Sequence, residues 1–353
     1  MRGKNSITRK FIMLAGAAMF LTVFFCWQFL SRSGEETETA ESADAASEKV
    51  VLSLSGEEGE SFGESAAVKE TTAGGYTKEI TEGELTGLKE DLEQLTGQMD
   101  GTWSIYVKNL QTGDAISLNN QEMYAASLIK LFVMESAFEN KKELVENDSL
   151  LSGSVQASEE KFTDVLTAMI TVSDNESYNE LVRLHSPSLD FVEGCTSVEE
   201  WLEDSNYTDT GIYHTLSPSE TEPQQISEEE ENHTSVEDCG KLLEAIYSGT
   251  CVSEEASREM LAFLCEQQLT TKIPAGLPEG VLSANKTGET DEVEHDTAIV
   301  FGEETDYILC VMSEGWSDSD EAVWMIQRIS ELVYESLNLS LIHIYKTVFK
   351  SFP

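Results

Sequence analysis

Residues 125–132 read Ala-Ala-Ser-Leu-Ile-Lys-Leu-Phe, an apolar, helix-like stretch interrupted only by Ser127 and Lys130. Residues three apart lie on the same face of a helix, so these two side chains are expected to meet. A lysine whose pKa is lowered by burial or by a neighbouring cation can accept the proton of a serine hydroxyl and so create a nucleophile. Because Ser127 would open the helix, its backbone N–H would also face a developing oxyanion. The alternative interpretation is an ordinary core helix that begins with a capping serine.

Two further polar triplets follow along the chain and point to the same kind of site. Ser173-Asp174-Asn175 lies between two helix-like stretches, where such residues taken alone are ordinary turn and cap residues. Lys286-Thr287-Gly288 ends an apolar, strand-like stretch. A cation and a hydroxyl at a strand edge can hold a substrate carboxylate, and a glycine lets a ligand approach the backbone closely. Lys286 is also a cation of the kind that would lower the pKa of Lys130.

In this order the three motifs are the signature of class A β-lactamases and penicillin-binding proteins. The chain therefore resembles that serine hydrolase superfamily, and the class A branch most closely, over about residues 82–337. The resemblance implies that Ser127 is the nucleophile, Lys130 its base and Ser173 the relay that passes a proton to the leaving nitrogen. Similar segments flank the motifs at residues 169–172, 177–181, 272–278 and 295–300.

The resemblance also implies how a substrate would be held. Asn175 would bind the side-chain amide of the substrate, and the backbone N–H of Glu289 would be the second oxyanion donor. Lys286, Thr287 and Gly288 would complete the binding site. The expected reaction is hydrolysis of a β-lactam amide through an acyl-enzyme, with no cofactor and no metal ion.

One departure from the family pattern keeps other functions open. Class A enzymes carry a loop glutamate, in a Glu-Pro-x-x-Asn context, that activates the deacylating water. The corresponding region here is 208–232, where Glu222 precedes Pro223 but stands too far downstream and lacks the asparagine. Glu222 is therefore a weak candidate for the deacylation base, and Glu220 is no better. Without such a base the acyl-enzyme would hydrolyse slowly. The alternatives are a D-Ala-D-Ala carboxypeptidase or penicillin-binding protein acting on cell-wall stem peptides, and a catalytically weak sensor or binding domain.

Hydrophobic periodicity predicts an α+β domain. We expect an antiparallel sheet flanked by helices, and the resemblance adds an all-helical lobe with the site at the junction. The predicted strands are 103–110, 115–118, 281–286, 297–301 and 307–312. The predicted helices are 82–99, 128–138, 162–172, 176–185, 234–247, 253–268 and 319–337.

The first 80 residues predict a tethered protein. Residues 1–33 read as a short cytoplasmic tail and a transmembrane signal anchor, because basic residues precede an apolar run over 11–30 that is long enough to span a bilayer. A cleaved signal peptide is the competing interpretation. Residues 34–80 read as an acidic, disordered linker, and 81–338 as the serine hydrolase domain outside the cell membrane. Residues 339–353 resemble a translated sequencing adaptor and are expected to be a non-native tail.

Composition excludes some partners. The 353 residues include 66 acidic and only 22 basic side chains, for a formal net charge of −44. So acidic a composition disfavours binding to nucleic acid, because phosphate binding needs clustered Lys and Arg. It also favours a monomer. The membrane contact is therefore expected only through the N-terminal helix.

Cysteine and histidine give weaker indications. The chain has six cysteines without metal-type spacing, so both a disulfide and buried free thiols stay open. The five histidines form no zinc-type pair. A Ser-His-Asp arrangement that uses His295 and Asp296 is compatible with the spacing, but it is less economical than a lysine base.

Overall fold

The computed structural model describes residues 82–217 and 222–339. The predicted anchor, the whole predicted linker (34–80) and the tail beyond residue 339 lie outside these ranges. Within the described ranges, no helix is both long and apolar enough to cross a membrane.

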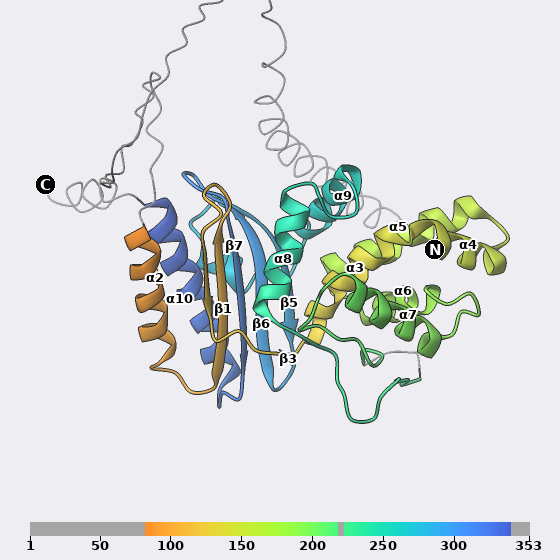
Figure 1. Cartoon of the computed structure of the whole chain (residues 1–353), viewed down its shortest axis with the longest axis horizontal. Helices are drawn as coiled ribbons and strands as arrows, with labels where there is room; N and C mark the ends of the chain where they lie inside the picture. Colours follow the sequence, from red (N-terminus) through yellow and green to blue (C-terminus); the bar gives the residue numbers. More distant parts are fainter. Residues whose placement is uncertain (1–81, 218–221, 340–353) are drawn as a thin grey trace, which may run out of the picture. The chain divides into compact units, whose positions relative to one another are not determined.

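A five-stranded antiparallel sheet is the centre of the domain, as Figure 1 shows. Its strands run in the order β2-β1-β7-β6-β5, so the first hairpin of the chain pairs with the last strand. The α+β fold predicted from the sequence is confirmed. The strands are β1 (Thr102–Asn109), β2 (Ala115–Leu118), β5 (Leu282–Glu289), β6 (Val293–Phe301) and β7 (Tyr307–Glu314).

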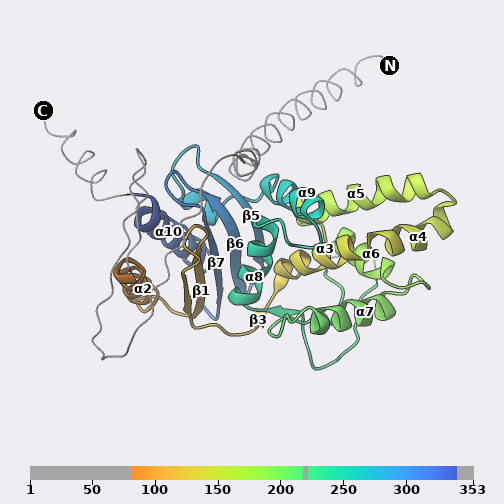
Figure 2. The same cartoon turned by 45° about the horizontal axis from the view of Figure 1, so that its top comes forward.

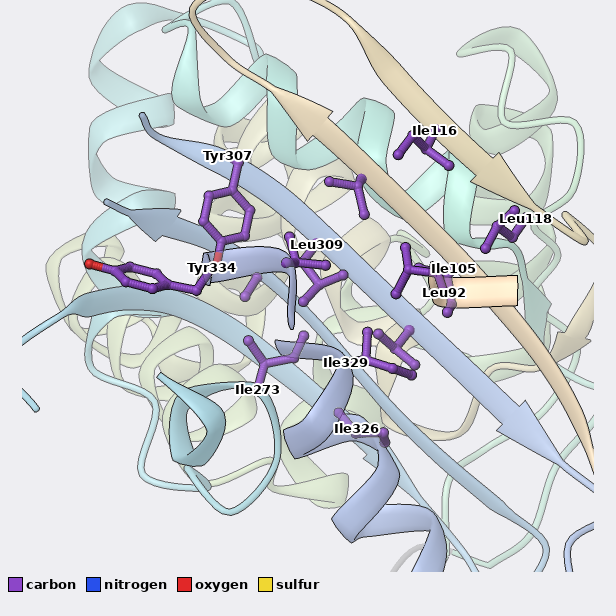
Figure 3. Packing of buried hydrophobic residues seen from close by; sticks show 14 of the residues in the cluster. Leu92, Ile105, Ile116, Leu118, Ile273, Tyr307, Leu309, Ile326, Ile329 and Tyr334 are labelled. Atoms are coloured by element: carbon purple, nitrogen blue, oxygen red, sulfur yellow. The ribbon is translucent and has the colours of Figure 1, made fainter. Parts of the chain in front are cut away.

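Two helices from opposite ends of the domain cover one face of the sheet. These are α2 (Glu82–Thr96) and α10 (Ser319–Asn338). Alternate residues of β1 point into the core beneath these helices. Ile105 is labelled in Figure 3, and Val107 belongs to the same buried cluster. Tyr106 points to the other face, where its ring lies against Gly240 of α8 (Val236–Tyr247).

A helical lobe stands beside the edge strand β5 (Figure 2). It contains α3 (Ile129–Glu139), α4 (Lys141–Ser152), α5 (Val155–Thr171), α6 (Asn175–Leu184) and α7 (Phe191–Asp204), and α9 (Glu254–Cys265) packs against both α5 and β5. Short strands β3 (Met123–Tyr124) and β4 (His233–Thr234) pair where the chain passes between sheet and lobe.

Two helices were not predicted from the sequence. In α4 only four residues are buried, two of them polar, so the helix lacks a clear apolar stripe. In α7, Gly194 interrupts the helical pattern. A Cβ at that position would lie 2.0 Å from the carbonyl oxygen of Val182, so the glycine permits close packing of α7 on α6. Both helices are therefore products of packing within the lobe.

The cysteines of the described ranges are all free thiols. Four of the five are buried, in separate segments of the chain: Cys195, Cys239, Cys251 and Cys310. Of the two interpretations left open by the sequence, buried thiols describe this part of the chain.

Candidate active site

Ser127 lies in a 3-10 turn, η1 (Ala126–Leu128), that leads directly into α3. The residue before it, Ala126, has a left-handed backbone with φ of 45°. That conformation is unfavourable for a residue with a Cβ and is often found at functional sites. The turn is held from outside, because the N–H of Ala125 donates to the carbonyl of Asn232 at 2.8 Å. Ser127 is therefore presented from a rigid, strained connection.

The amine of Lys130 is the centre of the site. Its Nζ lies 3.0 Å from Oγ of Ser127, 3.2 Å from Oγ of Ser173 and 2.7 Å from Oδ1 of Asn175. It also donates to the carbonyl of Ser173 at 2.6 Å. The side chain is fully buried, and desolvation lowers the pKa of Lys130 to about 7, against the opposing charge of Asp174. Burial, the first of the two causes anticipated from the sequence, is thus the one that dominates.

In the triplet Ser173-Asp174-Asn175, the first and last residues reach the pocket, whereas Asp174 stabilises a helix. Asp174 caps α6, since its carboxylate accepts from the N–H and the hydroxyl of Ser177 at 2.7 and 2.6 Å. Ser173 has a left-handed φ of 59°, which leaves both its carbonyl and its hydroxyl near Lys130. The cap interpretation of this triplet is correct for Asp174, and it does not exclude the pocket.

Lys286 enters the same pocket from strand β5. Its Nζ donates to Oγ of Ser173 at 2.8 Å and to the carbonyl of Thr287 at 2.7 Å. Complete burial lowers the pKa of Lys286 well below its ordinary value, and the nearby charge of Lys130 lowers it further. Ser173 is therefore a hydroxyl held between two amines whose charged forms are both disfavoured.

Gly288 contacts η1. A Cβ there would lie 3.0 Å from the carbonyl oxygen of Ala125 and 3.1 Å from Cγ of Leu128. The sequence explanation for this glycine, close approach of a ligand, is thus incomplete. Its missing side chain lets the strand pack against the turn that carries Ser127.

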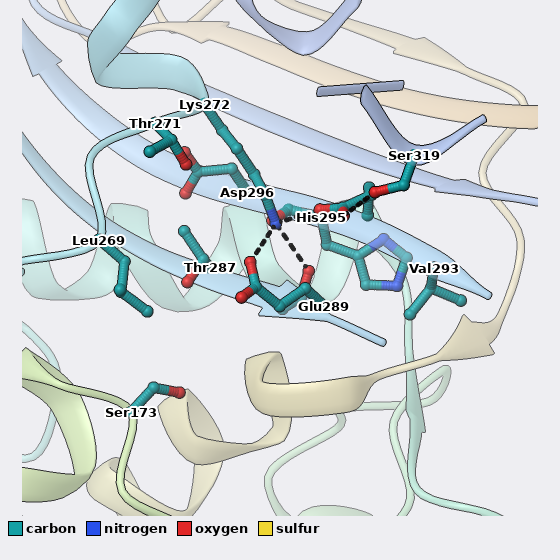
Figure 4. A network of polar contacts seen from close by, with 12 residues as sticks. Ser173, Leu269, Thr271, Lys272, Thr287, Glu289, Val293, His295, Asp296 and Ser319 are labelled. Carbon is teal, nitrogen blue, oxygen red and sulfur yellow. Dashed lines mark hydrogen bonds and ion pairs between the residues drawn. The ribbon is translucent and has the colours of Figure 1, made fainter. Parts of the chain in front are cut away.

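Behind this strand lies a buried cation that the sequence analysis had quoted only as part of a flanking segment. Lys272, 1% exposed, pairs with Glu294 at 2.6 Å and with Glu289 at 3.1 Å (Figure 4). It also donates to the carbonyls of Gly288 and His295, both at 3.1 Å. Thr287 and Glu289 are two residues apart in β5 and so share a strand face. The only hint in the sequence was a lysine in an otherwise apolar segment.

The loop between α7 and β4 reaches the site at Leu216 and Ser217. The side-chain amide of Asn179, on α6, accepts a hydrogen bond from the N–H of Leu216 at 2.9 Å and donates one to the carbonyl of Leu216 at 3.1 Å. Asn175 donates to the carbonyl of Ser217 at 2.9 Å. Glu222 is exposed, and no contact joins it to the residues around Ser127 in the described ranges. Glu220 lies outside those ranges.

The geometry rules out the histidine-based arrangement. The ring of His295 is completely buried, accepts from the N–H of Ser313 at 3.1 Å and lies 2.9 Å from the carbonyl of Tyr124. Asp296 instead accepts from the N–H of Ile273 and from Asn285, at 2.9 and 3.0 Å. The side chains of His295 and Asp296 are therefore both held by hydrogen bonds in the protein interior. The described residues also contain no group of acidic, His or Cys side chains suited to a metal ion.

Comparisons with known proteins agree with this architecture. The model of the β-lactamase enzyme family Beta-lactamase2 matches residues 87–337. No curated protein sequence matches the chain. Among solved structures, the chain is similar to PBP-A, with 21% identity and a TM-score of 0.56, over 71% of this chain and 96% of that one. It is also similar to the TLA-1 extended-spectrum β-lactamase, with 18% identity and a TM-score of 0.59, over 71% and 98%.

A third similar structure is a leucine-to-glutamate mutant of PBP-A, solved as an acyl-enzyme complex with penicillin G. It has 21% identity and a TM-score of 0.55, over 71% of this chain and 96% of that one. At such identities the structural likeness shows the fold alone.

Proposed function

Because the chain belongs to the β-lactamase enzyme family, we propose that it is a serine acyl hydrolase that β-lactam amides acylate at Ser127. One observation carries the proposal: the buried amine of Lys130 lies 3.0 Å from the Ser127 hydroxyl. A pKa of about 7 leaves a large fraction of that amine neutral near neutral pH, so it can accept a proton.

The acylation step uses the residues gathered in the pocket. Lys130 takes the proton of the Ser127 hydroxyl as Oγ attacks the carbonyl carbon, and the carbonyl oxygen becomes an oxyanion. The backbone N–H groups of Ser127 and Glu289 are proposed to stabilise that oxyanion. As the amide C–N bond breaks, the proton passes from Lys130 through Oγ of Ser173 to the leaving nitrogen. The short contacts of Ser173 with both lysine amines support this relay.

Asn175 is proposed to bind the amide of the substrate side chain, as the family resemblance implies. The side-chain amide of Asn175 is already oriented, because its oxygen accepts from Lys130 and its nitrogen donates to the carbonyl of Ser217. Lys286 and Thr287 are proposed to line the opposite side of the substrate, and no cofactor or metal ion enters the reaction.

Deacylation is proposed to be slow, which favours penicillin-binding behaviour as the second candidate function. The observation that supports it is the loop contact: Leu216 and Ser217 lie beside the site, whereas Glu222 is exposed. PBP-A, one of the similar structures, was solved with penicillin G as an acyl-enzyme in a leucine-to-glutamate mutant. A peptidase acting on D-Ala-D-Ala stem peptides would use the same acylation residues.

Intact-protein mass spectrometry tests the acylation. The purified protein is incubated separately with benzylpenicillin and with its uncharged methyl ester. We expect a mass increase of one penicillin moiety, located by peptide mapping at Ser127, with at least one of the two reagents. Ser127→Ala is the matched control and should abolish the adduct without changing the circular dichroism spectrum. Absence of any adduct in the wild type would contradict the proposal.

A time course after removal of excess reagent separates the two candidate functions. Rapid loss of the adduct and sustained hydrolysis of a chromogenic cephalosporin would favour a β-lactamase. A long-lived adduct with a single burst would favour a penicillin-binding enzyme. If Glu222 is nevertheless the deacylation base, Glu222→Gln should lengthen the adduct lifetime.

We also propose that residues 1–33 anchor the protein in a cell membrane and leave the hydrolase domain outside it. The support is the sequence alone: basic residues precede an apolar run over 11–30. Expression of the full chain followed by membrane fractionation and protease treatment of intact cells tests this. The protein should stay with the membranes, and external protease should degrade the domain.

A further inference from the structure

Thr287 shares its strand face with several acidic residues and one cation. In the β5–β6 ladder, Thr287 is opposite Asp296 and Glu289 is opposite Glu294. Directly opposed like charges destabilise a sheet unless something neutralises them. Lys272, buried behind the strands, contacts both glutamates and supplies the neutralising charge.

The two glutamates around Lys272 are not equivalent. Glu294 is 8% exposed and also accepts from the hydroxyl of Ser319 at 2.8 Å, so it is fixed from two sides. Glu289 is 57% exposed and its contact with Lys272 is the longer one, at 3.1 Å. Two backbone carbonyls hold the amine of Lys272 independently of either glutamate. The Glu289 carboxylate can therefore leave, and an anion that replaced it would meet a cation already in position.

The other lysine of this strand does not offer the same charge. Lys286 points to Ser173, on the opposite strand face from Glu289, and it donates to the Ser173 hydroxyl and to the carbonyl of Thr287 within the proposed catalytic pocket. Burial disfavours its protonated form. A substrate carboxylate beside Thr287 would consequently depend on Lys272 for a counter-ion, and Glu289 already occupies it.

We propose that Glu289 is a specificity-determining residue: its carboxylate occupies the anion position at Lys272 and makes the site favour acyl donors that carry no carboxylate next to the reacting amide. This inference rests on the proposed acylation at Ser127 and names the substrate class of that site. Penicillins, cephalosporins and peptides ending in a free D-alanine all carry such a carboxylate. They must displace Glu289 to bind, whereas neutral esters and amides need not.

The test compares acylation rates for benzylpenicillin and its methyl ester in the wild type and in Glu289→Gln. Glutamine keeps the size of the side chain and removes its charge. We expect the acid-to-ester rate ratio to rise at least about tenfold, the effect of one charge-assisted hydrogen bond gained by the substrate. Glu294→Gln is the matched control, since it removes the same charge from the same lysine on the buried side. It should leave the ratio within about twofold of wild type.

An unchanged ratio in Glu289→Gln, or an equal rise in Glu294→Gln, would overturn the inference. If neither reagent acylates any of the proteins, the proposed function fails, and titration calorimetry with phenylacetate still decides the inference. Binding that is at least about tenfold tighter in Glu289→Gln than in wild type, and that is lost in the double variant Glu289→Gln with Lys272→Met, supports an anion position masked by Glu289. Equal binding, or none, in wild type and Glu289→Gln overturns it.

Discussion

Two properties of Lys130 suit it to act as a general base. It is completely buried, and it makes contacts with four polar atoms of Ser127, Ser173 and Asn175. Burial disfavours the ammonium form, while the contacts hold the amine in line with the Ser127 hydroxyl. With a pKa of about 7, a large fraction of the amine is neutral near neutral pH while its contacts orient it, which a general base requires.

The acylation rate should consequently depend on pH through Lys130. The amine accepts a proton only when it is deprotonated, and desolvation sets its pKa at about 7. We expect the rate to rise as pH increases through about 7 and then to level off. Stopped-flow acylation with benzylpenicillin methyl ester, which carries no carboxylate of its own, measures this between about pH 5.5 and 9.

Asp174→Asn is the matched variant for that profile. The charge of Asp174 raises the pKa of Lys130, against the larger effect of burial. Asparagine caps a helix about as well as aspartate, so α6 should be retained. Removing the charge should move the midpoint of the profile to lower pH. A flat profile, or a midpoint that moves upward, would argue against Lys130 as the base.

Among the elements, the contact between β5 and the turn η1 matters most for the site. Ser127 comes from the turn and Lys286 from the strand, and Gly288 lets the two approach. The distance between Ser127 and β5 thus depends on the lack of a side chain at Gly288. Small shifts at such a contact are costly, because catalytic groups must be held to a fraction of an ångström.

Gly288→Ala should therefore impair acylation more than it impairs folding. The added Cβ would lie 3.0 Å from the Ala125 carbonyl oxygen and 3.3 Å from Cδ2 of His295, so strand and turn must separate slightly. We expect about a tenfold or greater loss of acylation rate and a destabilisation of about 1–3 kcal/mol by urea unfolding.

Gly87→Ala provides the control for that substitution. Gly87 lies within α2, and among the described residues outside its own stretch of helix no heavy atom lies within 4 Å of its ideal Cβ position. Alanine should stabilise the helix there by about 0.5–1 kcal/mol and leave acylation unchanged. Normal acylation in Gly288→Ala would show that the close contact with η1 is not needed.

At the scale of the whole molecule, charge is the dominant property. A formal net charge of −44 in 353 residues means that folding brings many carboxylates together. Repulsion between like charges opposes the compact state and is weakened when salt shortens the Debye length. The same repulsion is the physical basis of the expectation that the protein is a monomer.

Added salt should accordingly stabilise the protein. Raising NaCl from about 20 to about 300 mM shortens the screening length severalfold, and we expect the Tm to rise by a few degrees. Differential scanning calorimetry at fixed pH measures the change. KCl at equal ionic strength should have the same effect, because screening does not depend on the identity of the cation. A Tm that falls with NaCl would show that net repulsion does not limit stability.

The sequence determined the candidate catalytic residues and the general plan of this domain. Serine and lysine three residues apart share a helix face, because this relation depends only on local backbone geometry. The predicted strand 281–286 ended before Thr287 and Glu289, whereas β5 continues through both residues. The strands of the sheet and the final helix were predicted on the same basis. The helices α4 and α7 were not, since their stability depends on the lobe around them.

Tertiary structure alone decided which of these residues meet and in what environment. Lys130 contacts Asn175 across 45 residues of chain and Lys286 contacts Ser173 across 113, so their burial and lowered pKa values depend on how lobe and sheet pack. The same packing placed Leu216 and Ser217 against Asn179 and Asn175. It also placed Lys272 between Glu289 and Glu294. The desolvation of a side chain depends on all the residues packed around it. Many of these residues come from distant segments, so the spacing of motifs in the sequence does not predict the desolvation.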